Sequence, residues 1–327
     1  MNEPFDKEPD PELGPFIDTP PRWFERALAI EPESRFVKVE GTDVHYLHWG
    51  DPSKPGLLLV HGNGAHARWW SFIAPLLARE YSVAAIDISG MGDSGWRDSY
   101  SLEVFAEEQM AVCEHAGFFR NDESPIIVGH SFGGFVTIVT GSLYGDRLSG
   151  TVIVDSPVNP PGRPSGPPDH AVRQHRIYPT IEAALGRFRL APPQPCANRY
   201  ILDYIARHSL KQVPNPDGGT GWTWKFDPAI WQRFDIGDMS ARLAATRCRI
   251  AIMRGEFSGL VPPEIGDYMF TLLGRAAPVV EIPLAHHHIM LDQPLAFVAA
   301  LRTLLVDWEH SKPTRRGDLI ARVPFAT

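Results

Sequence analysis

A serine that lies between two glycines, after an apolar run, is the residue of this sequence best suited to nucleophilic chemistry. Ser131 follows the β-branched run 126–128 within the sequence Gly-His-Ser-Phe-Gly, and a helix-compatible run over 135–143 comes next. This matches the G-x-S-x-G pattern, in which the chain turns sharply from a strand into a helix. The turn lifts the hydroxyl of Ser131 clear of the sheet edge. It also places the N–H of Phe132 at a helix N-terminus, where a developing oxyanion is stabilised.

The composition limits the class of protein and its partners. The 327 residues are 43% hydrophobic, which is ordinary for a soluble globular protein, and the formal net charge is −8. This acidic balance argues against nucleic acid or an anionic membrane as a partner. Cys113, Cys196 and Cys248 form no C-x-x-C pair, which favours a reducing compartment. No signal-peptide pattern and no apolar run of about eighteen residues is visible, so we expect a soluble, cytoplasmic protein.

Strands and helices are expected to alternate on both sides of Ser131. A β-hairpin is predicted over 36–49, and further strands are predicted over 56–60, 81–86, 126–128, 148–154, 249–253 and 278–282. Helices are predicted over 69–80, 102–116, 135–143, 263–273 and 294–308. Such alternation predicts βαβ units that build a parallel sheet.

The alternation stops at Asp155. Residues 156–245 are rich in proline, glycine and aromatic residues, with amphipathic helical pieces over 181–190 and 199–209 and a loop over 213–219. We interpret this stretch as an inserted helical cap. The full predicted division is an N-terminal extension (1–34), a first part of the core (35–155), the cap (156–245), a second part of the core (246–310) and a C-terminal tail (311–327).

Three motifs in one chain order resemble the α/β-hydrolase fold family over roughly residues 35–310. They are the serine motif, the loop His61-Gly62-Asn63-Gly64 and the histidine segment 281–294. The resemblance implies an α/β fold with a mostly parallel eight-stranded sheet, flanking helices and an inserted helical cap. It also implies an active site at the carboxyl edge of the sheet, where ligands bind in such architectures, and no cofactor.

Within the family pattern, the loop 61–64 corresponds to the oxyanion loop, so the backbone N–H of Asn63 would be a second oxyanion donor beside Phe132. A plain glycine turn is the structural alternative. The glycine-rich segment 87–95 is expected to be structural, because short acids such as Asp87 and Asp93 accept hydrogen bonds from local backbone N–H groups.

The resemblance places the catalytic base in the histidine segment, five residues before an acid-Gln-Pro sequence. Counting back from Asp292 selects His287, with His286 or His288 as alternatives. Three adjacent histidines are also compatible with a metal site. Adjacent side chains splay apart, however, and no second acidic cluster completes a zinc signature, so we predict no metal.

The acid that orients the histidine departs from the usual family position. The family usually places it in a Gly-x-x-Asp segment after the seventh strand, but here Ser258 occupies that place, and serine cannot balance an imidazolium charge. Asp155 ends the sixth strand at the same sheet edge, and some family members carry the acid there. We therefore predict Asp155, with Glu256 as the alternative acid. A local turn at the entry to the cap is the alternative role for Asp155.

These residues predict acyl transfer. Dehalogenases and epoxide hydrolases of this fold carry aspartate where this chain has Ser131, so we expect hydrolysis of a small-molecule ester or lactone through an acyl-enzyme. An apolar pocket lined by Trp69, Trp222 or Trp224 is expected, although most cap aromatics should pack the cap against the core. The alternatives are hydrolysis of a carbon–carbon bond in a vinylogous diketone and a non-catalytic ligand receptor on the same scaffold.

Overall fold

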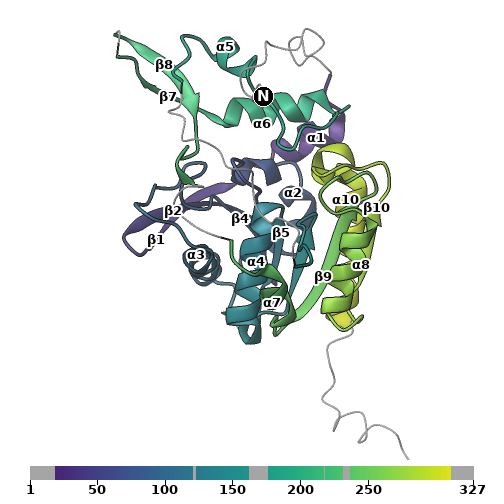
Figure 1. Ribbon diagram of the computed structural model, residues 1–327. Coiled ribbons are helices and arrows are strands. Elements are labelled where there is room, and N and C mark those ends of the chain that lie inside the picture. The colour runs from purple at the N-terminus through teal and green to yellow at the C-terminus, as the bar shows by residue number, and fades with distance from the viewer. Residues whose placement is uncertain (1–18, 121–122, 162–175, 217, 231–235, 311–327) are drawn as a thin grey trace, which may run out of the picture.

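An eight-stranded sheet forms the centre of the computed structural model, which describes residues 19–120, 123–161, 176–216, 218–230 and 236–310 (Figure 1). Its strand order is β1-β2-β4-β3-β5-β6-β9-β10. The strands are β1 (Glu33–Val39), β2 (Thr42–Trp49), β3 (Gly56–Val60), β4 (Ser82–Ile86), β5 (Ile126–His130), β6 (Gly150–Val154), β9 (Arg249–Gly255) and β10 (Val279–Ile282). β2 is antiparallel to β1 and β4, and all other neighbours are parallel, which confirms the predicted sheet.

Alternate residues of the central strands face two separate apolar cores. In β3, Leu57 and Leu59 lie in one core, whereas Leu58 and Val60 lie in the other. A strand that is apolar on both faces needs helices on both sides of its sheet.

Helices cover both faces of the sheet. The first core is closed by η2 (Ala67–Trp70), α2 (Ala74–Leu77), α9 (Ile289–Asp292) and α10 (Pro294–His310). The second is closed by α3 (Leu102–His115), α4 (Phe132–Tyr144), α7 (Met239–Ala244) and α8 (Pro263–Leu272). The short η4 (Gly145–Arg147) follows α4. Figure 1 shows α3, α4 and α7 in front of the sheet.

The predicted helix over 69–80 is wrong as a single element. The chain instead forms η2 and α2, with residues 71–73 between them. Pro75 explains the interruption, because proline has no backbone N–H to donate and its ring clashes with the preceding helical turn. It is tolerated only in the first turn of a helix, and here it stands in the first turn of α2.

The insertion between β6 and β9, which we call the cap, contains strands as well as helices. It holds α5 (Ile181–Leu185), α6 (Arg199–His208), β7 (Leu210–Pro214), β8 (Thr220–Trp224) and α7. Figure 1 shows α5, α6 and the β7–β8 hairpin above the sheet and α7 beside α4. Two expectations change. The helix predicted over 181–190 ends at Leu185, and the loop predicted from residue 213 begins inside β7. The strand β8 contains Thr220, Trp222 and Trp224, and threonine and tryptophan favour strands.

The N-terminal part packs on the cap. α1 (Arg22–Leu28) places the ring of Phe24 4.9 Å from that of Tyr200 in α6, centroid to centroid. Residues 1–18 and the predicted tail 311–327 lie outside the described residues, and the five-segment division stays a prediction.

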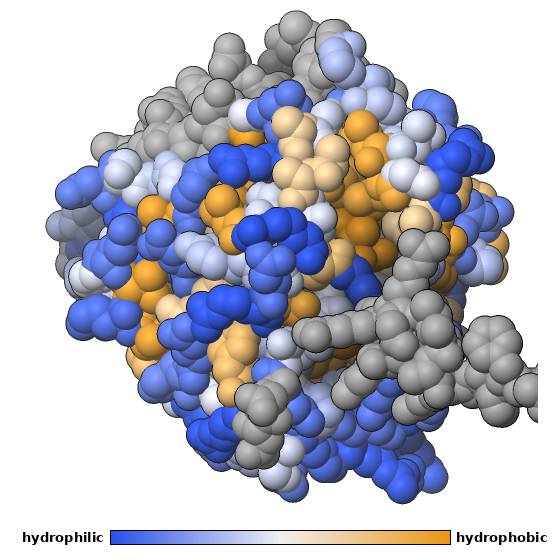
Figure 2. All heavy atoms as spheres, turned by 90° about the horizontal axis from the view of Figure 1, so that it is seen from below, coloured by the Kyte–Doolittle hydropathy of each residue, from blue (hydrophilic) through white to orange (hydrophobic). Residues whose placement is uncertain are grey.

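None of the helices within the described ranges is long and apolar enough to cross a membrane. The face seen from below in Figure 2 is mixed, with hydrophobic residues gathered in groups among hydrophilic ones.

Candidate active site

Four neighbouring parallel strands bring four polar residues to one edge of the sheet. β3, β5, β6 and β9 run in the same direction and lie side by side. The residues that follow their carboxyl ends are His61, Ser131, Asp155 and Glu256. The carboxyl edge of such a sheet is where open α/β folds bind ligands.

Ser131 occupies a strained turn between β5 and α4. Its backbone has φ 55° and ψ −120°, outside the regions that residues with side chains normally adopt. The Ser131 N–H donates to the Val154 carbonyl (2.9 Å), and the Ser131 carbonyl accepts from the Ser156 hydroxyl (2.7 Å) and the Gly134 N–H (2.9 Å). Hydrogen bonds on both sides therefore hold the turn, and the hydroxyl stands at the sheet edge, as the motif predicts.

The glycines around Ser131 are required by close backbone approach. A Cβ at Gly129 would lie 2.4 Å from the Gly133 carbonyl oxygen, and a Cβ at Gly133 would lie 2.4 Å from that of His61. A Cβ at Gly62 would lie 3.1 Å from the Ser131 Cβ, so the loop 61–64 passes directly beside the serine. Asn63 in this loop is exposed, whereas Phe132, the first residue of α4, is buried.

His287 is hydrogen-bonded to both Ser131 and Asp155. Its Nε2 lies 2.9 Å from the Ser131 Oγ, and its Nδ1 lies 2.7 Å from the Asp155 Oδ2. A carboxylate only accepts hydrogen bonds, so the Nδ1 carries a proton and donates it, which leaves the Nε2 of the neutral ring to accept from the serine hydroxyl. His287 and Asp155 are buried, and Ser131 is half-buried.

Asp155 is fixed by two further donors. The Gly255 N–H donates to its Oδ1 (3.0 Å), and the Ser258 hydroxyl donates to the same Oδ2 that His287 contacts (2.6 Å). The backbone of Asp155 has φ 50° and donates its N–H to the Met253 carbonyl at 2.8 Å. Ser258, which occupies the usual family position of the acid, therefore donates to the carboxylate of Asp155, which follows the neighbouring strand β6.

The two candidate acids differ in what they contact. The Glu256 side chain is exposed, and its Oε2 accepts the Leu284 N–H at 2.8 Å. Glu256 thus holds the backbone of Leu284, three residues before His287, whereas Asp155 contacts His287 directly. Of the two, the structure thus brings Asp155 to the histidine.

The two other histidines of the segment have different surroundings. The Nδ1 of His286 lies 3.2 Å from the Asp292 carboxylate. The ring of His288 lies 5.5 Å from that of His130 and 5.3 Å from that of Trp69, centroid to centroid. Burial lowers the pKa of His288 well below the usual histidine value, so this ring stays uncharged at neutral pH.

His130 contacts the histidine segment in a way that the sequence did not suggest. Its Nε2–H donates to the main-chain carbonyl of His287 (3.0 Å), and burial lowers its pKa well below the usual value. This residue occupies a variable position of the G-x-S-x-G pattern, so no motif signal points to it. It fixes the backbone at His287 while remaining uncharged.

His130, His287 and His288 also form a group whose ligand atoms lie within 4.8 Å of one another. A metal at this group would compete with the hydrogen bonds of His287 to Ser131 and Asp155. Within the described ranges, His45, Asp87 and Asp93 form a second group of that kind. There Asp87 accepts from the His45 Nδ1 and from the backbone N–H groups of Ala67 and Asp93, which agrees with the structural role expected of it. We keep the prediction that the site needs no metal.

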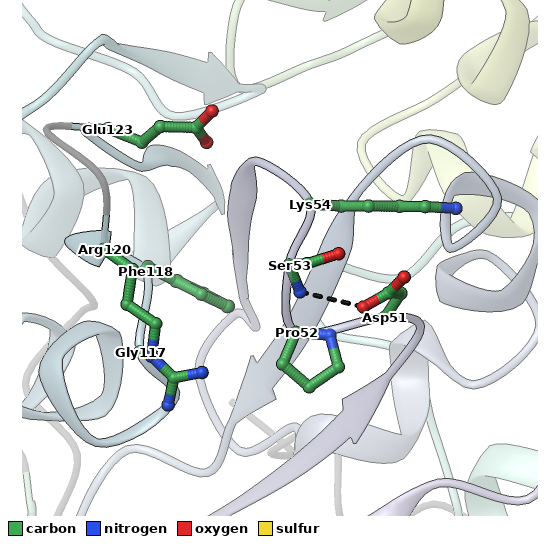
Figure 3. A pocket seen from close by; sticks show the side chains of 8 residues that line it. All are labelled: Asp51, Pro52, Ser53, Lys54, Gly117, Phe118, Arg120 and Glu123. Atoms are coloured by element: carbon green, nitrogen blue, oxygen red, sulfur yellow. Dashed lines mark hydrogen bonds between the residues drawn. The ribbon is translucent and has the colours of Figure 1, made fainter.

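The predicted pocket tryptophans lie in two places. Trp69 is buried beside His288. Trp222 and Trp224 pack inside the cap against an apolar cluster of Ala184, Leu185, Ala206 and Leu210. A depression of about 420 Å³ lies at the amino end of β3, on the opposite sheet edge, and is lined by residues of both charges (Figure 3). A role for these tryptophans in substrate binding stays a prediction.

Ser258→Ala is expected to lower kcat, because the Asp155 carboxylate loses one of its orienting donors. A hydrogen bond to a charged group contributes about 1.5–3 kcal/mol, which corresponds to roughly a ten- to hundred-fold effect on the rate. Steady-state kinetics on an activated ester measure it. Ser142→Ala, which removes a hydroxyl bonded to the Val139 carbonyl in α4, is the matched control. An unchanged kcat in the Ser258 variant would show that this hydroxyl does not orient the Asp155 carboxylate for catalysis.

Comparison with known proteins assigns the chain to one family. The model of the alpha/beta hydrolase family matches residues 57–301, and the chain belongs to this family. Lipase LipV of Mycobacterium tuberculosis is 29% identical over 116 residues, which are 36% of this chain and 42% of the lipase. Fluoroacetate dehalogenase of a Burkholderia species is 36% identical over 108 residues, which are 31% of this chain and 34% of the dehalogenase. The matches thus span less than half the length of these curated relatives.

Solved structures share the fold over most of the chain. The thioesterase domain of the curacin biosynthetic pathway superposes with a TM-score of 0.68 at 22% identity, over 84% of this chain and 99% of the domain. An esterase of Mycobacterium tuberculosis superposes with a TM-score of 0.64 at 21% identity, over 87% of this chain and 95% of the esterase. These similarities confirm the predicted α/β-hydrolase fold.

Proposed function

We propose that this protein is a serine hydrolase that cleaves carboxylic esters or lactones through an acyl-enzyme on Ser131. The observation that carries the proposal is the hydrogen-bonded series Ser131–His287–Asp155 at the carboxyl edge of the sheet. A serine hydroxyl is a weak nucleophile until an adjacent base accepts its proton. The similarity to a lipase and an esterase adds support, since the names of these proteins describe ester cleavage.

The first half of the reaction acylates the serine. The Ser131 oxygen attacks the substrate carbonyl while the His287 Nε2 takes the hydroxyl proton, and Asp155 stabilises the resulting imidazolium. The negative charge develops on the former carbonyl oxygen, where the N–H groups of Asn63 and Phe132 are proposed as donors. The placement of the loop 61–64 against the Ser131 Cβ supports this assignment.

Acylation is completed when the alcohol leaves, and the second half of the reaction then releases the acid. His287 passes its proton to the departing alcohol, and the ester bond breaks to leave the acyl group on Ser131. Water then gives a proton to His287 and attacks the acyl carbonyl through a second oxyanion. Collapse of that oxyanion returns the proton to the Ser131 oxygen and frees the carboxylic acid. A lactone follows the same course, with the alcohol retained in the released hydroxy acid.

A substrate panel tests this proposal against its alternatives. We expect the protein to hydrolyse nitrophenyl esters and lactones of some acyl and alcohol lengths and to leave a vinylogous diketone intact. The measurement is initial rate against substrate concentration for each compound. Cleavage of the diketone without ester hydrolysis would favour the carbon–carbon hydrolase. Saturable ligand binding with no turnover of any compound would favour the receptor.

A further inference from the structure

Two amide side chains of the cap are bonded to the segment that carries His287. Gln194 lies in the stretch between α5 and α6, and Asn198 directly precedes α6. The Gln194 Nε2 donates to both oxygens of Asp292 (3.1 and 3.0 Å), and its Oε1 accepts the His288 N–H (2.8 Å). The Asn198 Nδ2 donates to the carbonyls of Leu291 (2.7 Å) and Asp292 (3.1 Å). The cap therefore contacts the part of this segment that directly follows His287, from His288 to Asp292.

Hydrogen bonds to Gln194 or to its partner Asp292 fix the residues on both sides of His287. On one side, the His286 N–H donates to the Asp292 Oδ2 (2.7 Å), the carboxylate that Gln194 holds. On the other side, the His288 N–H donates to Gln194 itself. Between them, the His287 carbonyl accepts from His130. Each of the three backbone units 286–288 is thus fixed by a side chain, and Gln194 takes part in fixing two of them.

The surroundings of Gln194 favour a fixed geometry. Pro193 and Pro195 flank it, and a proline restricts both its own φ and the conformation of the residue before it. Little backbone freedom is then lost when the amide forms its three hydrogen bonds. The Asp292 side chain is only 7% exposed, and burial raises its pKa, whereas the hydrogen bonds from His286 and Gln194 act in the opposite direction. The amide thus supplies donors to a carboxylate that has little access to water.

We propose that Gln194 is a positioning residue for His287, through which the cap sets the alignment of the base with Ser131. This inference rests on the proposed function. Through Gln194 the cap contributes to the chemical step, in addition to any role in substrate selection. A misplacement of about 1 Å of a reacting group can lower a rate by about a hundred-fold, and the Nε2 of His287 has to stay within hydrogen-bond reach of the serine hydroxyl.

The test compares three variants of the Gln194–Asp292 pair in the full-length protein. Gln194→Ala should lower kcat on a nitrophenyl ester about ten- to a hundred-fold, because the segment loses its fixed alignment, with KM changed less than about two-fold. The rate constant of Ser131 labelling by a fluorophosphonate should fall in parallel. Gln194→Glu should be impaired as well, since it sets two carboxylates against each other.

Adding Asp292→Asn to Gln194→Glu reverses the direction of the hydrogen bond between the two side chains and keeps their hydrogen bonds to the backbone. The new carboxylate accepts from the new amide and from the His288 N–H, and the amide oxygen still accepts from the His286 N–H. We expect this double variant to recover most of the wild-type kcat. A merely structural role predicts that kcat follows the thermal unfolding midpoint in all variants. Gln212→Ala, an exposed glutamine of β7, is the matched control and should leave both quantities unchanged.

The outcomes separate this inference from the proposed function. If wild-type protein neither hydrolyses esters nor reacts with the fluorophosphonate, the proposed function fails. If the wild type does both, but Gln194→Ala retains its kcat, the positioning role is wrong and the function stands. A double variant no more active than Gln194→Glu alone would also overturn the positioning role, as would a loss confined to KM.

Discussion

Ser131→Ala is expected to remove ester hydrolysis and covalent labelling together. The hydroxyl that His287 contacts at 2.9 Å is the proposed nucleophile, and alanine offers no oxygen to acylate. Loss of the nucleophile in a serine hydrolase lowers kcat on the order of 10⁶-fold. Hydrolysis of a nitrophenyl ester and gel detection of a fluorescent fluorophosphonate measure the two effects. The fold should persist, because the bonds that hold the turn are made by the backbone of Ser131.

The control for this variant is Ser142→Ala, which removes a half-buried hydroxyl in α4 and should keep wild-type activity and labelling. Undiminished hydrolysis in the Ser131 variant would refute the nucleophile assignment. Labelling that survives in that variant would identify another residue as the reactive one.

Asp155→Asn is expected to have the second largest effect, a loss of about ten-thousand-fold in kcat. The amide has nearly the same shape as the carboxylate, so the folded structure should be retained. It carries no charge to stabilise the imidazolium of His287, however, and its NH₂ group can favour the wrong tautomer of that ring. The measurements are kcat on an activated ester and the unfolding midpoint of the same preparation.

Glu256→Gln is the matched control for Asp155→Asn, since both replace a carboxylate by an amide after neighbouring strands. The Glu256 side chain is exposed and bonded to the Leu284 N–H, so its replacement should change kcat little. If Glu256→Gln caused the large loss and Asp155→Asn the small one, the acid would stand after β9 and our assignment would be wrong.

Two of the residues proposed for the chemistry were predictable because each directly follows the end of an apolar strand. Ser131 and Asp155 come directly after β5 and β6, whose neighbouring positions in a parallel sheet follow from the alternation of strands and helices. His287 required the resemblance to a family, since counting back from Asp292 has no basis in periodicity. Whether Asp155 or Glu256 meets His287 depends on side-chain direction, and the sequence left both acids open.

Other features depend on tertiary contacts that local patterns do not reveal. Gln194 bonds to His288 and Asp292, which stand 94 and 98 residues later in the chain. Its proline-rich surroundings indicate only an irregular segment. The β7–β8 hairpin was missed because strand preference depends on neighbouring packing, and here the tryptophans of β8 pack on the cap's own apolar cluster.

The most direct test of the central claim is to trap the acyl-enzyme. Wild-type protein mixed with excess nitrophenyl acetate would be quenched in acid during the first turnovers, digested and examined by mass spectrometry. We predict an acetyl group on the peptide that carries Ser131, formed during a burst of nitrophenolate and lost at the rate of turnover once the ester is consumed. Steady hydrolysis with no adduct on that peptide, or an adduct on another residue that forms and decays at these rates, would contradict the account.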